Sequence, residues 1–523
     1  FRPISLIGSL NKLISKVLFA RIQPLVKSII SYHQFAGVKG RQSHEANFIA
    51  NEVLDSRKRS GKPGLILKLD IEKAFDSVNW NCLFNIVRSM GFNQKFHKWI
   101  KGIVSQSKLS VLVNGEATGF FSMERGLEQG DSLSPFLFNL VMDILAFMLD
   151  AANAAGLLSG FYFDEDRRRG EVSHILYADD AVIFCDATEH EVTNLLAVLL
   201  CFQSVTGLKV NLEKSKLFPV GEVPHLDRLA DLLCCDWDFL PTIYLGLPLG
   251  ASPTSGTIWN PLISRVQSRL QGWKGRFLSI GGRLVLIKSV LASQPTYLCS
   301  LYRAPTHVVQ TIEKLQCSFL WSGSQEQNKF HLVSWDRCKQ PKKWGGLGIP
   351  DFKRHNTALL SKWWWKFACG DSWWKDLMRI KYPNEDSQWM PGKPLSPVGC
   401  SPWSQVYKVK EEFWKFAVIS PGSGDCISFW RDRWVKGVTL ADCFPRGVHC
   451  AFLISRADSG RRQDSYNWGS GRRFPIQVSL VEPRTIQNLL VCLADLSSED
   501  THPGRTKTER LDYAQQVSFV LCT

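Results

Sequence analysis

Several features that would assign the chain to a simple class are missing from its sequence. None of the 15 cysteines forms a C-x-x-C pair, so the spacings of zinc ribbons, fingers and knuckles are absent. No stretch of about 20 residues is both apolar and free of charge, and we therefore expect no membrane partner. The chain starts at Phe1 without the pattern of a signal peptide. Free thiols then predict a reducing, intracellular location, in the nucleus or the cytoplasm.

The sequence is rich in positive charge. Its 523 residues include 63 Lys and Arg against 48 Asp and Glu, a formal net charge of +15. Such an excess supplies phosphate contacts and attracts polyanions, although a solvated basic surface would give the same count. With 45% hydrophobic and 21% charged residues, the composition is that of a globular protein. A prior of roughly 150 residues per domain predicts about three or four structural units.

Helical and strand patterns are mixed in the first half of the chain. Apolar residues at helical spacing, such as Leu10, Ile14 and Leu18, indicate a helix, whereas the apolar run before Asp70 indicates a strand. Because the helices are mixed with antiparallel hairpins, we predict an α+β fold and not a doubly wound sheet. We expect helices at 9–30, 43–59, 133–153 and 189–206, two more over 79–104 separated near Gly91, and strands at 65–69, 109–114, 119–124, 172–177 and 181–185, with a turn at Asn114-Gly115.

The chain changes character near Gly250. Residues 251–380 are rich in Trp, Arg and Lys, and their pattern predicts helices. Residues 381–404 are rich in Pro, Ser and Gly, which is typical of a linker. Residues 405–523 are weakly patterned, and we assign them no fold. The basic residues along 265–288 are Arg265, Arg269, Lys274, Arg276, Arg283 and Lys288.

Two acidic sites are candidates for metal binding. Asp70 follows a predicted strand, and Asp179 with Asp180 lies at the tip of a predicted hairpin. Consecutive carboxylates in a tight turn repel each other unless a counter-charge is present. A divalent cation is the usual remedy, and Mg²⁺ prefers a few carboxylates together with phosphates and waters. Taken alone, each motif is more often plain turn chemistry, so the prediction depends on the segments between them.

Those segments carry a resemblance to a known family. Seven blocks occur in order over roughly the first 250 residues, and together they resemble the reverse transcriptases of non-LTR (LINE-type) retrotransposons. The Trp-rich stretch that follows, including Gly345-Gly346-Leu347-Gly348, is similar to the post-palm region of plant elements of this type. The blocks are Phe1 to Leu6, Gln34 to Arg41, Asp70 to Asp76, Arg125 to Pro135, Tyr177 to Asp180, Gly207 to Asn211 and Tyr244 to Pro248.

The resemblance implies a fold and an activity. The fold would be a right-hand polymerase, with fingers and palm in residues 1–250 and a helical thumb in 251–380, whose six basic residues would follow a duplex backbone or form a solvated face. The activity would be RNA-directed DNA synthesis, with an RNA template, a DNA primer and dNTPs as partners. Asp70 and Asp179 would ligate two Mg²⁺ ions with help from Asp180, and Mn²⁺ is an alternative ion. The oligomeric state stays open.

The resemblance also implies residues that contact the incoming nucleotide. Phe75 would lie under the sugar and exclude a 2′-hydroxyl, although core packing is the plain alternative. Arg41 would hold the triphosphate through a bidentate contact. Gln129 and Gly130 would line the path of template and nucleotide, with glycine permitting close backbone approach. Lys209 is a candidate for protonating the leaving pyrophosphate. For Arg41 and Lys209, a solvated side chain is the plain alternative.

The chain departs from the family pattern in two places. The family usually has proline where this chain has Ser132, and a basic residue where it has Glu128. Proline would stiffen that loop, and Glu128 places negative charge near a polyanion. A truncated or decayed element product that binds nucleic acid without catalysis is therefore the alternative, and a structural protein is a third reading. Viral RNA-copying RNA polymerases share the palm but usually carry Asp at the spacing of Phe75, whereas Asp76 here stands one residue later.

Overall fold

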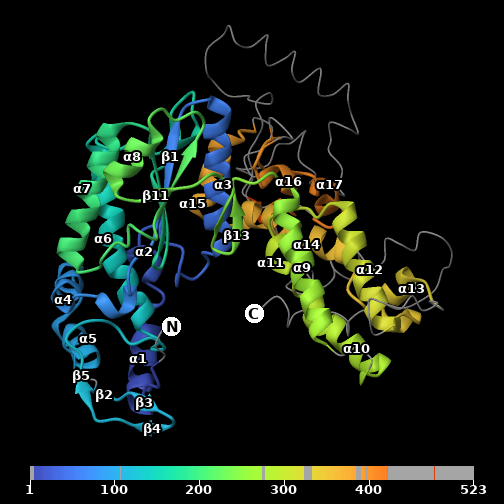
Figure 1. Cartoon of the computed structure of the whole chain (residues 1–523), viewed down its shortest axis with the longest axis horizontal. Coiled ribbons are helices and arrows are strands. Elements are labelled where there is room, and N and C mark those ends of the chain that lie inside the picture. Colours follow the sequence, from blue (N-terminus) through green and yellow to red (C-terminus); the bar gives the residue numbers. More distant parts are fainter. Residues whose placement is uncertain are drawn as a thin grey trace. The chain divides into compact units, whose positions relative to one another are not determined.

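The structure, a computed structural model, divides into two compact units, Phe1–Gly250 and Ala251–Thr523 (Figure 1). Each unit contains a hydrophobic core of its own. The residues that the structure describes are 5–105, 108–273, 277–322, 333–384, 390–394 and 399–417, together with the backbone of two short strands at 420–421 and 476–477.

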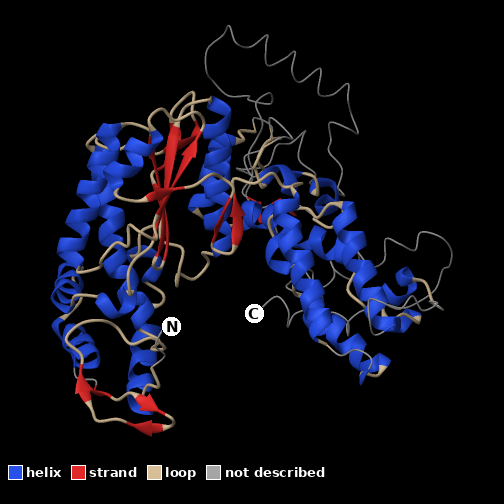
Figure 2. Ribbon diagram, in the orientation of Figure 1, coloured by secondary structure: helices blue, strands red, loops and turns tan. Residues whose placement is uncertain are grey.

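A five-stranded sheet forms the centre of the first unit (Figure 2). Its strand order is β11-β10-β1-β9-β8, and β1 has an antiparallel partner on each side. Leu65, Ile66 and Leu67 of β1 are fully buried, as a short continuous apolar run predicts for a strand inside a core. The strands are β1 (Gly64–Leu69), β8 (His174–Tyr177), β9 (Asp180–Asp186), β10 (Lys216–Val220) and β11 (Asp236–Trp237).

Helices cover both faces of this sheet (Figure 1). On one face, α6 and α7 pack in the main core with alternate residues of β1, namely Leu65, Leu67 and Leu69. On the other face lies α3, in which residues 45–57 are all buried. Burial of β1 from both sides fixes its register and therefore the point at which the chain leaves it. These helices are α3 (Ser43–Ser60), α6 (Ser134–Ala154) and α7 (Glu189–Thr206).

Local signals explain where these helices begin and end. Gln42 and Glu45 form a reciprocal capping box at the start of α3, and Gly61 ends the helix in the left-handed conformation. The Thr188 hydroxyl accepts a backbone N–H at the start of α7, and Gly207 ends that helix with φ 74°. The helices expected at 43–59, 133–153 and 189–206 are confirmed.

Helix α6 anchors a loop on the sheet. The Asn139 side chain donates to the Ala36 carbonyl at 2.7 Å, and the Asp143 carboxylate accepts the Ser31 N–H at 3.0 Å. The loop of residues 31–36 is therefore tied to α6 beside β8. Among the described helices, α6 is also the one long and apolar enough to cross a membrane, and 67% of its most apolar window is buried within the protein.

Two expected elements differ from the structure. The helix expected at 9–30 is broken into α1 (Ser9–Ile22) and α2 (Val26–Ile29), because Pro24 lacks an N–H and its ring disfavours the preceding helical turn. The strands expected at 109–114 and 119–124 are four shorter ones around the Asn114-Gly115 turn, where both residues have positive φ. They are β2 (Lys108–Leu109), β3 (Leu112–Val113), β4 (Glu116–Ala117) and β5 (Phe121–Ser122), and β2 pairs with β5 and β3 with β4.

The two helices expected over 79–104 are confirmed, with Gly91 between them in the left-handed region at φ 78°. The strand expected at 172–177 is interrupted at Ser173, so that its first part belongs to a separate hairpin with β6. The remaining elements of this unit are α4 (Trp80–Ser89), α5 (Gln94–Ser105), β6 (Phe161–Asp164), β7 (Arg169–Val172), α8 (Leu226–Leu233), β12 (Thr242–Tyr244), β13 (Leu247–Leu249) and the short 3-10 helix Ala74–Ser77.

The second unit is helical in its described part and is built around tryptophans. Trp364 is buried, with its ring centroid 4.7 Å from that of Trp403, and Trp363 packs against Trp374 at 5.0 Å. The elements are α9 (Gly256–Gly272), α10 (Ile280–Leu286), a π-helical turn (Ile287–Leu291), α11 (Thr296–Cys299), α12 (Thr306–Ser322), α13 (Trp335–Lys339), a 3-10 turn (Lys342–Trp344), α14 (Phe352–Cys369), α15 (Trp373–Lys381), α16 (Trp403–Tyr407), α17 (Lys410–Trp414), β14 (Ser420–Pro421) and β15 (Ile476–Gln477).

The segment expected to be a linker, 381–404, contributes packed side chains where the structure describes it. Tyr382 and Trp403 are buried. The Tyr382 hydroxyl lies 3.2 Å from Ser401 Oγ, and Trp403 Nε1 donates to the Gly392 carbonyl at 3.2 Å. The described residues of this segment are thus held to the second unit by aromatic anchors, which its Pro, Ser and Gly content does not indicate. Most of 405–523 lies outside the described residues.

Candidate active site

The hairpin of β8 and β9 presents two of the three predicted carboxylates. Tyr177 pairs with Asp180, so Ala178 and Asp179 form a two-residue turn. Ala178 has φ 53°, the left-handed conformation that such tight hairpin turns require. Asp179 is half-buried and Asp180 is exposed. The turn therefore carries adjacent carboxylates at the end of a buried hairpin.

The third carboxylate reaches the same edge of the sheet from β1. In the antiparallel ladder of β1 and β9, Leu69 pairs with Ala181. Asp70 follows Leu69, and Asp180 precedes Ala181, so the ladder brings these two aspartates side by side. The Asp70 side chain is exposed although its strand is buried. The structure thus brings Asp70, Asp179 and Asp180 together from sequence positions more than a hundred residues apart.

The backbone of Asp70 is held by a segment that follows α7. Ser215 Oγ accepts the Asp70 N–H at 3.1 Å and donates to the Asn211 carbonyl at 2.7 Å. The Asn211 N–H in turn donates to the Asp70 carbonyl at 2.8 Å. Ser215 is fully buried, so the backbone is fixed while the carboxylate stays in solvent. Sequence reasoning gave no role to Ser215 or Asn211, because nothing local marks a partner 145 residues away.

Buried Gln34 holds the turn from the other side. Its side-chain oxygen accepts the Ala178 N–H at 2.9 Å and the Ala36 N–H at 3.0 Å. The chain at Gln34 also forms a parallel bridge with Leu176 of β8. The loop of residues 31–36 therefore holds the turn of Ala178 and Asp179 in place. The sequence placed Gln34 in a family block but did not indicate this contact.

Tyr244 of the β12–β13 hairpin interacts electrostatically with the Asp180 carboxylate. The side chain is buried, and burial raises the pKa of its hydroxyl well above the usual value. The negative charge of Asp180 raises the pKa further. Lys68 Nζ donates to the Ile243 carbonyl at 2.9 Å and ties the same hairpin to β1. The β12–β13 hairpin, which contains Tyr244, thus contacts β1 close to the point where Asp70 follows it.

The donor set at this edge fits divalent cations. Its predicted ligands, Asp70, Asp179 and Asp180, offer only carboxylate oxygens, the ligands that hard cations such as Mg²⁺ prefer. Carboxylates on adjacent strand ends repel one another unless a cation lies between them. Two of the three side chains are exposed, which leaves the site open to a substrate.

A family model described as reverse transcriptase (RNA-dependent DNA polymerase) matches residues 1–249. These residues are a reverse transcriptase domain. The α+β architecture is accordingly that of the right-hand polymerases, and domains of this kind use divalent metal ions. The matched range ends one residue before the first unit does.

Curated relatives come from retroelements and from a plant. A putative ribonuclease H protein of Arabidopsis thaliana is 36% identical over 37% of this chain and 32% of its own length. The Pol polyprotein of the R2 retrotransposable element of Popillia japonica is 26% identical over 69% of this chain and 50% of its own. A transposon TX1 protein of Xenopus laevis is 27% identical over 67% of this chain and 26% of its own length. The chain thus spans about a quarter to a half of the length of these relatives.

Phe75, five residues after Asp70 in the chain, is anchored by its ring and by its backbone. The ring stacks on Phe138 of α6, with centroids 4.6 Å apart and planes 14° apart. The Phe75 carbonyl accepts the Leu127 N–H at 2.7 Å. The side chain is only partly buried, so one face packs on the reverse transcriptase core while part of it stays accessible. The predicted contact with the sugar stays a prediction.

Arg41 lies against backbone carbonyls. Its guanidinium donates to the Gln34 carbonyl at 2.6 Å and to the Ile30 carbonyl at 3.3 Å. Burial lowers its pKa, although the nearby Asp143 carboxylate acts in the opposite direction. Burial also raises the pKa of Asp143 to about 7. Arg41 therefore organises the loop that supports the catalytic turn, and to hold a triphosphate it would have to exchange some of these contacts.

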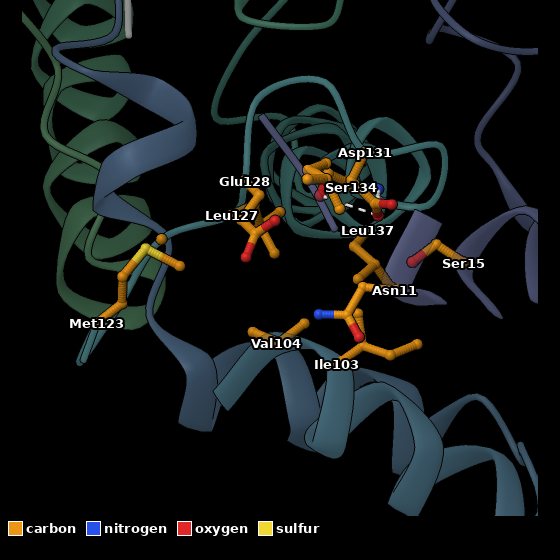
Figure 3. Close-up of a pocket in the computed structure, with 12 residues that line it drawn as sticks. Asn11, Ser15, Ile103, Val104, Met123, Leu127, Glu128, Asp131, Ser134 and Leu137 are labelled. Atoms are coloured by element: carbon orange, nitrogen blue, oxygen red, sulfur yellow. Dashed lines mark hydrogen bonds between the residues drawn. The ribbon is translucent and has the colours of Figure 1, made fainter. Parts of the chain in front are cut away.

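Gln129 and Gly130 lie in the chain between Glu128 and Asp131, two residues that line a small pocket at the start of α6 (Figure 3). The Gln129 carbonyl accepts the Ser5 N–H at 3.0 Å, and Gly130 has φ 111°, a conformation that favours glycine. Asp131, which follows, caps α6 by accepting the Ser134 N–H at 3.2 Å. The pocket is lined by Ile7, Asn11, Ser15, Ile103, Val104, Met123, Gly126, Leu127, Glu128, Asp131, Ser134 and Leu137. Glu128 thus faces this pocket, and the predicted template path stays a prediction.

Lys209 is exposed, and its ammonium lies 3.9 Å from the Glu72 carboxylate. The backbone beneath it is fixed, because the Lys209 carbonyl accepts the Glu72 N–H at 2.9 Å. The predicted role of Lys209 in protonating pyrophosphate stays a prediction.

The six basic residues predicted along 265–288 have different environments. Arg265 and Arg269 are exposed on α9. Arg283 instead donates to the Leu320 carbonyl at the end of α12, at 3.1 Å. Burial and the charge of Lys342 lower the pKa of Lys288. Lys274 and Arg276 lie outside the described residues. Within the described part, Arg265 and Arg269 are the members of the set best placed to meet a phosphate backbone.

Proposed function

We propose that the chain is the RNA-directed DNA polymerase of a non-LTR retrotransposon. It would extend a DNA primer on an RNA template with dNTPs, using two Mg²⁺ ions held by Asp70, Asp179 and Asp180. The observation that carries the proposal is the convergence of these three carboxylates at one open edge of a buried sheet, within a reverse transcriptase domain. Its free cysteines, of which Cys185 and Cys299 are buried, suit an intracellular, reducing location, in the nucleus or the cytoplasm.

The chemistry that this edge supports is nucleotidyl transfer. Bound Mg²⁺ ions supply Lewis acidity for the primer 3′-hydroxyl and charge stabilisation for the leaving pyrophosphate. The protein contributes rigidity, because Ser215 and Gln34 fix the backbones from which the carboxylates project. Positioning of this kind accounts for much of the rate in phosphoryl transfer, where the protein does little covalent chemistry.

Phe75 supports DNA synthesis over RNA synthesis. A ring fixed by stacking on Phe138 cannot move aside without losing that contact. If the nucleotide sugar lies over Phe75, a 2′-hydroxyl would collide with the ring, and Asp76 would not be in place to accept it.

The test is primer extension by the full chain with a defined RNA template, a DNA primer, dNTPs and Mg²⁺. We expect extension that stops when EDTA removes the metal and that is much weaker when rNTPs replace dNTPs. RNA binding that weakens with salt, without extension under any metal condition, would instead indicate the non-catalytic alternative. In that case, the double replacement Ser132→Pro and Glu128→Arg would not restore extension.

A further inference from the structure

A second group of metal-ligating side chains lies at the opposite end of β8 from the catalytic turn. His33 comes from the loop after α2, Asp150 from α6 and His174 from the first residue of β8. One ligand atom from each lies within 4.8 Å of the other two. His33 Nε2 is 3.3 Å from the Asp150 carboxylate, and the two imidazole rings are 3.9 Å apart. Both histidines are buried, whereas Asp150 is partly exposed.

The hydrogen bonds of both rings are made through Nδ1. His33 Nδ1 lies 3.0 Å from the His174 carbonyl, which can only accept, so the proton of a neutral His33 is on Nδ1 and its lone pair is on Nε2. His174 Nδ1 lies 2.9 Å from Ser173 Oγ. His174 Nε2 is fully buried and has no hydrogen-bond partner among the described residues. A buried polar atom left in this way is costly.

From this geometry we infer that His33, Asp150 and His174 bind a Zn²⁺ ion. Neutral imidazoles and one carboxylate are ligands of zinc, and Mg²⁺ would prefer oxygen ligands only. Each zinc–ligand bond is about 2.0–2.1 Å, so tetrahedral ligand atoms lie about 3.3–3.5 Å apart. The His33–Asp150 separation of 3.3 Å matches this distance, and His174 offers a ring nitrogen within 4.8 Å of both. Water can fill the fourth position through the exposed side of Asp150.

The outer hydrogen bonds of the group also suit a metal site. Ligating histidines usually donate their second N–H to a carbonyl or another acceptor, which fixes the ring and its tautomer. His33 has the His174 carbonyl in that role, and His174 has the Ser173 hydroxyl. A bound ion would join α6, β8 and the loop of residues 31–36, the loop whose Gln34 holds the catalytic turn. The site would therefore be structural, and it does not depend on the proposed polymerase chemistry.

Without a metal, the same residues have a simpler arrangement. A protonated His33 would pair with the Asp150 carboxylate, and His174 would stay neutral. Burial and the positive charge of His33 lower the pKa of His174 well below its usual value, which agrees with a neutral ring in either arrangement. The two arrangements differ in whether the chain takes up zinc.

The test is titration of the metal-stripped full chain with Zn²⁺, followed by calorimetry, and with Co²⁺, followed by visible absorption. We expect a tight site whose Co²⁺ spectrum shows nitrogen and oxygen ligands without a thiolate band, and a rise in Tm when Zn²⁺ is added. His174→Ala should lower the affinity about 100-fold or more. Asp150→Asn, at a partly exposed position where folding is not at risk, should lower it about 10-fold.

The matched control is His190→Ala, which removes an exposed histidine of α7 outside the group. This variant should keep the zinc affinity and the rise in Tm of the wild type. Uptake by cysteines elsewhere would show as a thiolate band that His174→Ala leaves unchanged. Zinc affinity and Tm shifts that are equal in the wild type and in a folded Asp150→Asn chain would overturn the site in favour of the His33–Asp150 ion pair.

Discussion

The two ends of strand β8 carry opposite kinds of chemistry. At its C-terminal end, Asp179 and Asp180 meet Asp70 in a solvent-facing set of carboxylates. At its N-terminal end, His174 meets His33 and Asp150 in a largely buried group with two imidazoles. The first set suits hard, exchangeable ions and a charged substrate, and the second suits a borderline ion that stays in place. The strand thus separates a set of carboxylates from a group that contains two imidazoles.

The comparison also shows how the two ends are connected. His33 and Gln34 are neighbours in the chain, and they contact opposite ends of the strand: the His174 carbonyl and the Ala178 N–H. Asp143 and Arg41 hold the loop that carries them. Two adjacent residues of the loop thus contact both ends of the strand.

The largest expected effect separates the two ends. Asp70→Asn should lower primer extension at least about 1,000-fold, equivalent to about 4 kcal/mol in the barrier, because a neutral amide is a poor Mg²⁺ ligand. The backbone contacts of Asp70 stay, so Tm should change little. Zinc uptake should match that of the wild type. Loss of both primer extension and zinc uptake in this variant would show that the two ends of β8 are not independent.

The next effect concerns pH and the loop. Burial raises the pKa of Asp143 to about 7 in the folded chain from an ordinary 3.8. The stability that this group contributes is complete below the ordinary pKa and is lost as pH rises through about 7, because ionisation opposes folding. Asp143→Asn cannot ionise, so its advantage over the wild type should grow by about 2–3 kcal/mol from about pH 5 to about pH 8. A constant difference in unfolding free energy across that range would refute the assignment.

The third prediction concerns Gln34, which connects the loop of residues 31–36 to the turn at Ala178. Gln34→Ala leaves the Ala36 and Ala178 N–H groups without their acceptor, and the side chain is fully buried. We expect a loss of about 1–3 kcal/mol in unfolding free energy. Extension should fall while zinc still binds, since no ligand has been removed. An unchanged rate in a destabilised chain would show that Gln34 does not position the turn.

The smallest effect concerns the choice of sugar. Phe75→Ala should lower the preference for dNTPs over rNTPs about 10-fold, equivalent to about 1.4 kcal/mol. Phe138→Leu is the control, because it removes the stacking partner and keeps the Phe75 side chain itself. If both variants lose stability and neither changes the preference, Phe75 is a packing residue only.

Sequence reasoning singled out Asp70, Asp179 and Asp180 as candidates because consecutive aspartates at a hairpin tip and an aspartate after an apolar run are local patterns. The burial of β1 on both sides fixes its register, so the sequence could predict that Asp70 and Asp180 are adjacent. The sequence could not predict the supporting contacts of Ser215 and Gln34, because their partners are distant along the chain. Arg41 looked like a ligand for phosphate, since charge alone does not reveal that carbonyls already surround a guanidinium.

The histidine group shows the same limit. His33 and His174 are separated by 141 positions and match no spacing typical of a metal motif. In the segment 381–404, composition predicts a linker, and it does not indicate that Tyr382 and Trp403 are buried. Local sequence patterns single out the candidate carboxylates, whereas the residues that hold them in place are found only from tertiary contacts.

The most direct measurement is RNA-templated primer extension by the wild type, Asp179→Asn and Asp166→Asn, compared at equal concentrations with Mg²⁺. Asp166 is an exposed aspartate in the β6–β7 turn and serves as the matched control. We predict extension by the wild type and by Asp166→Asn, and none by a folded Asp179→Asn chain. Extension that survives Asp179→Asn would contradict the assignment of the catalytic edge.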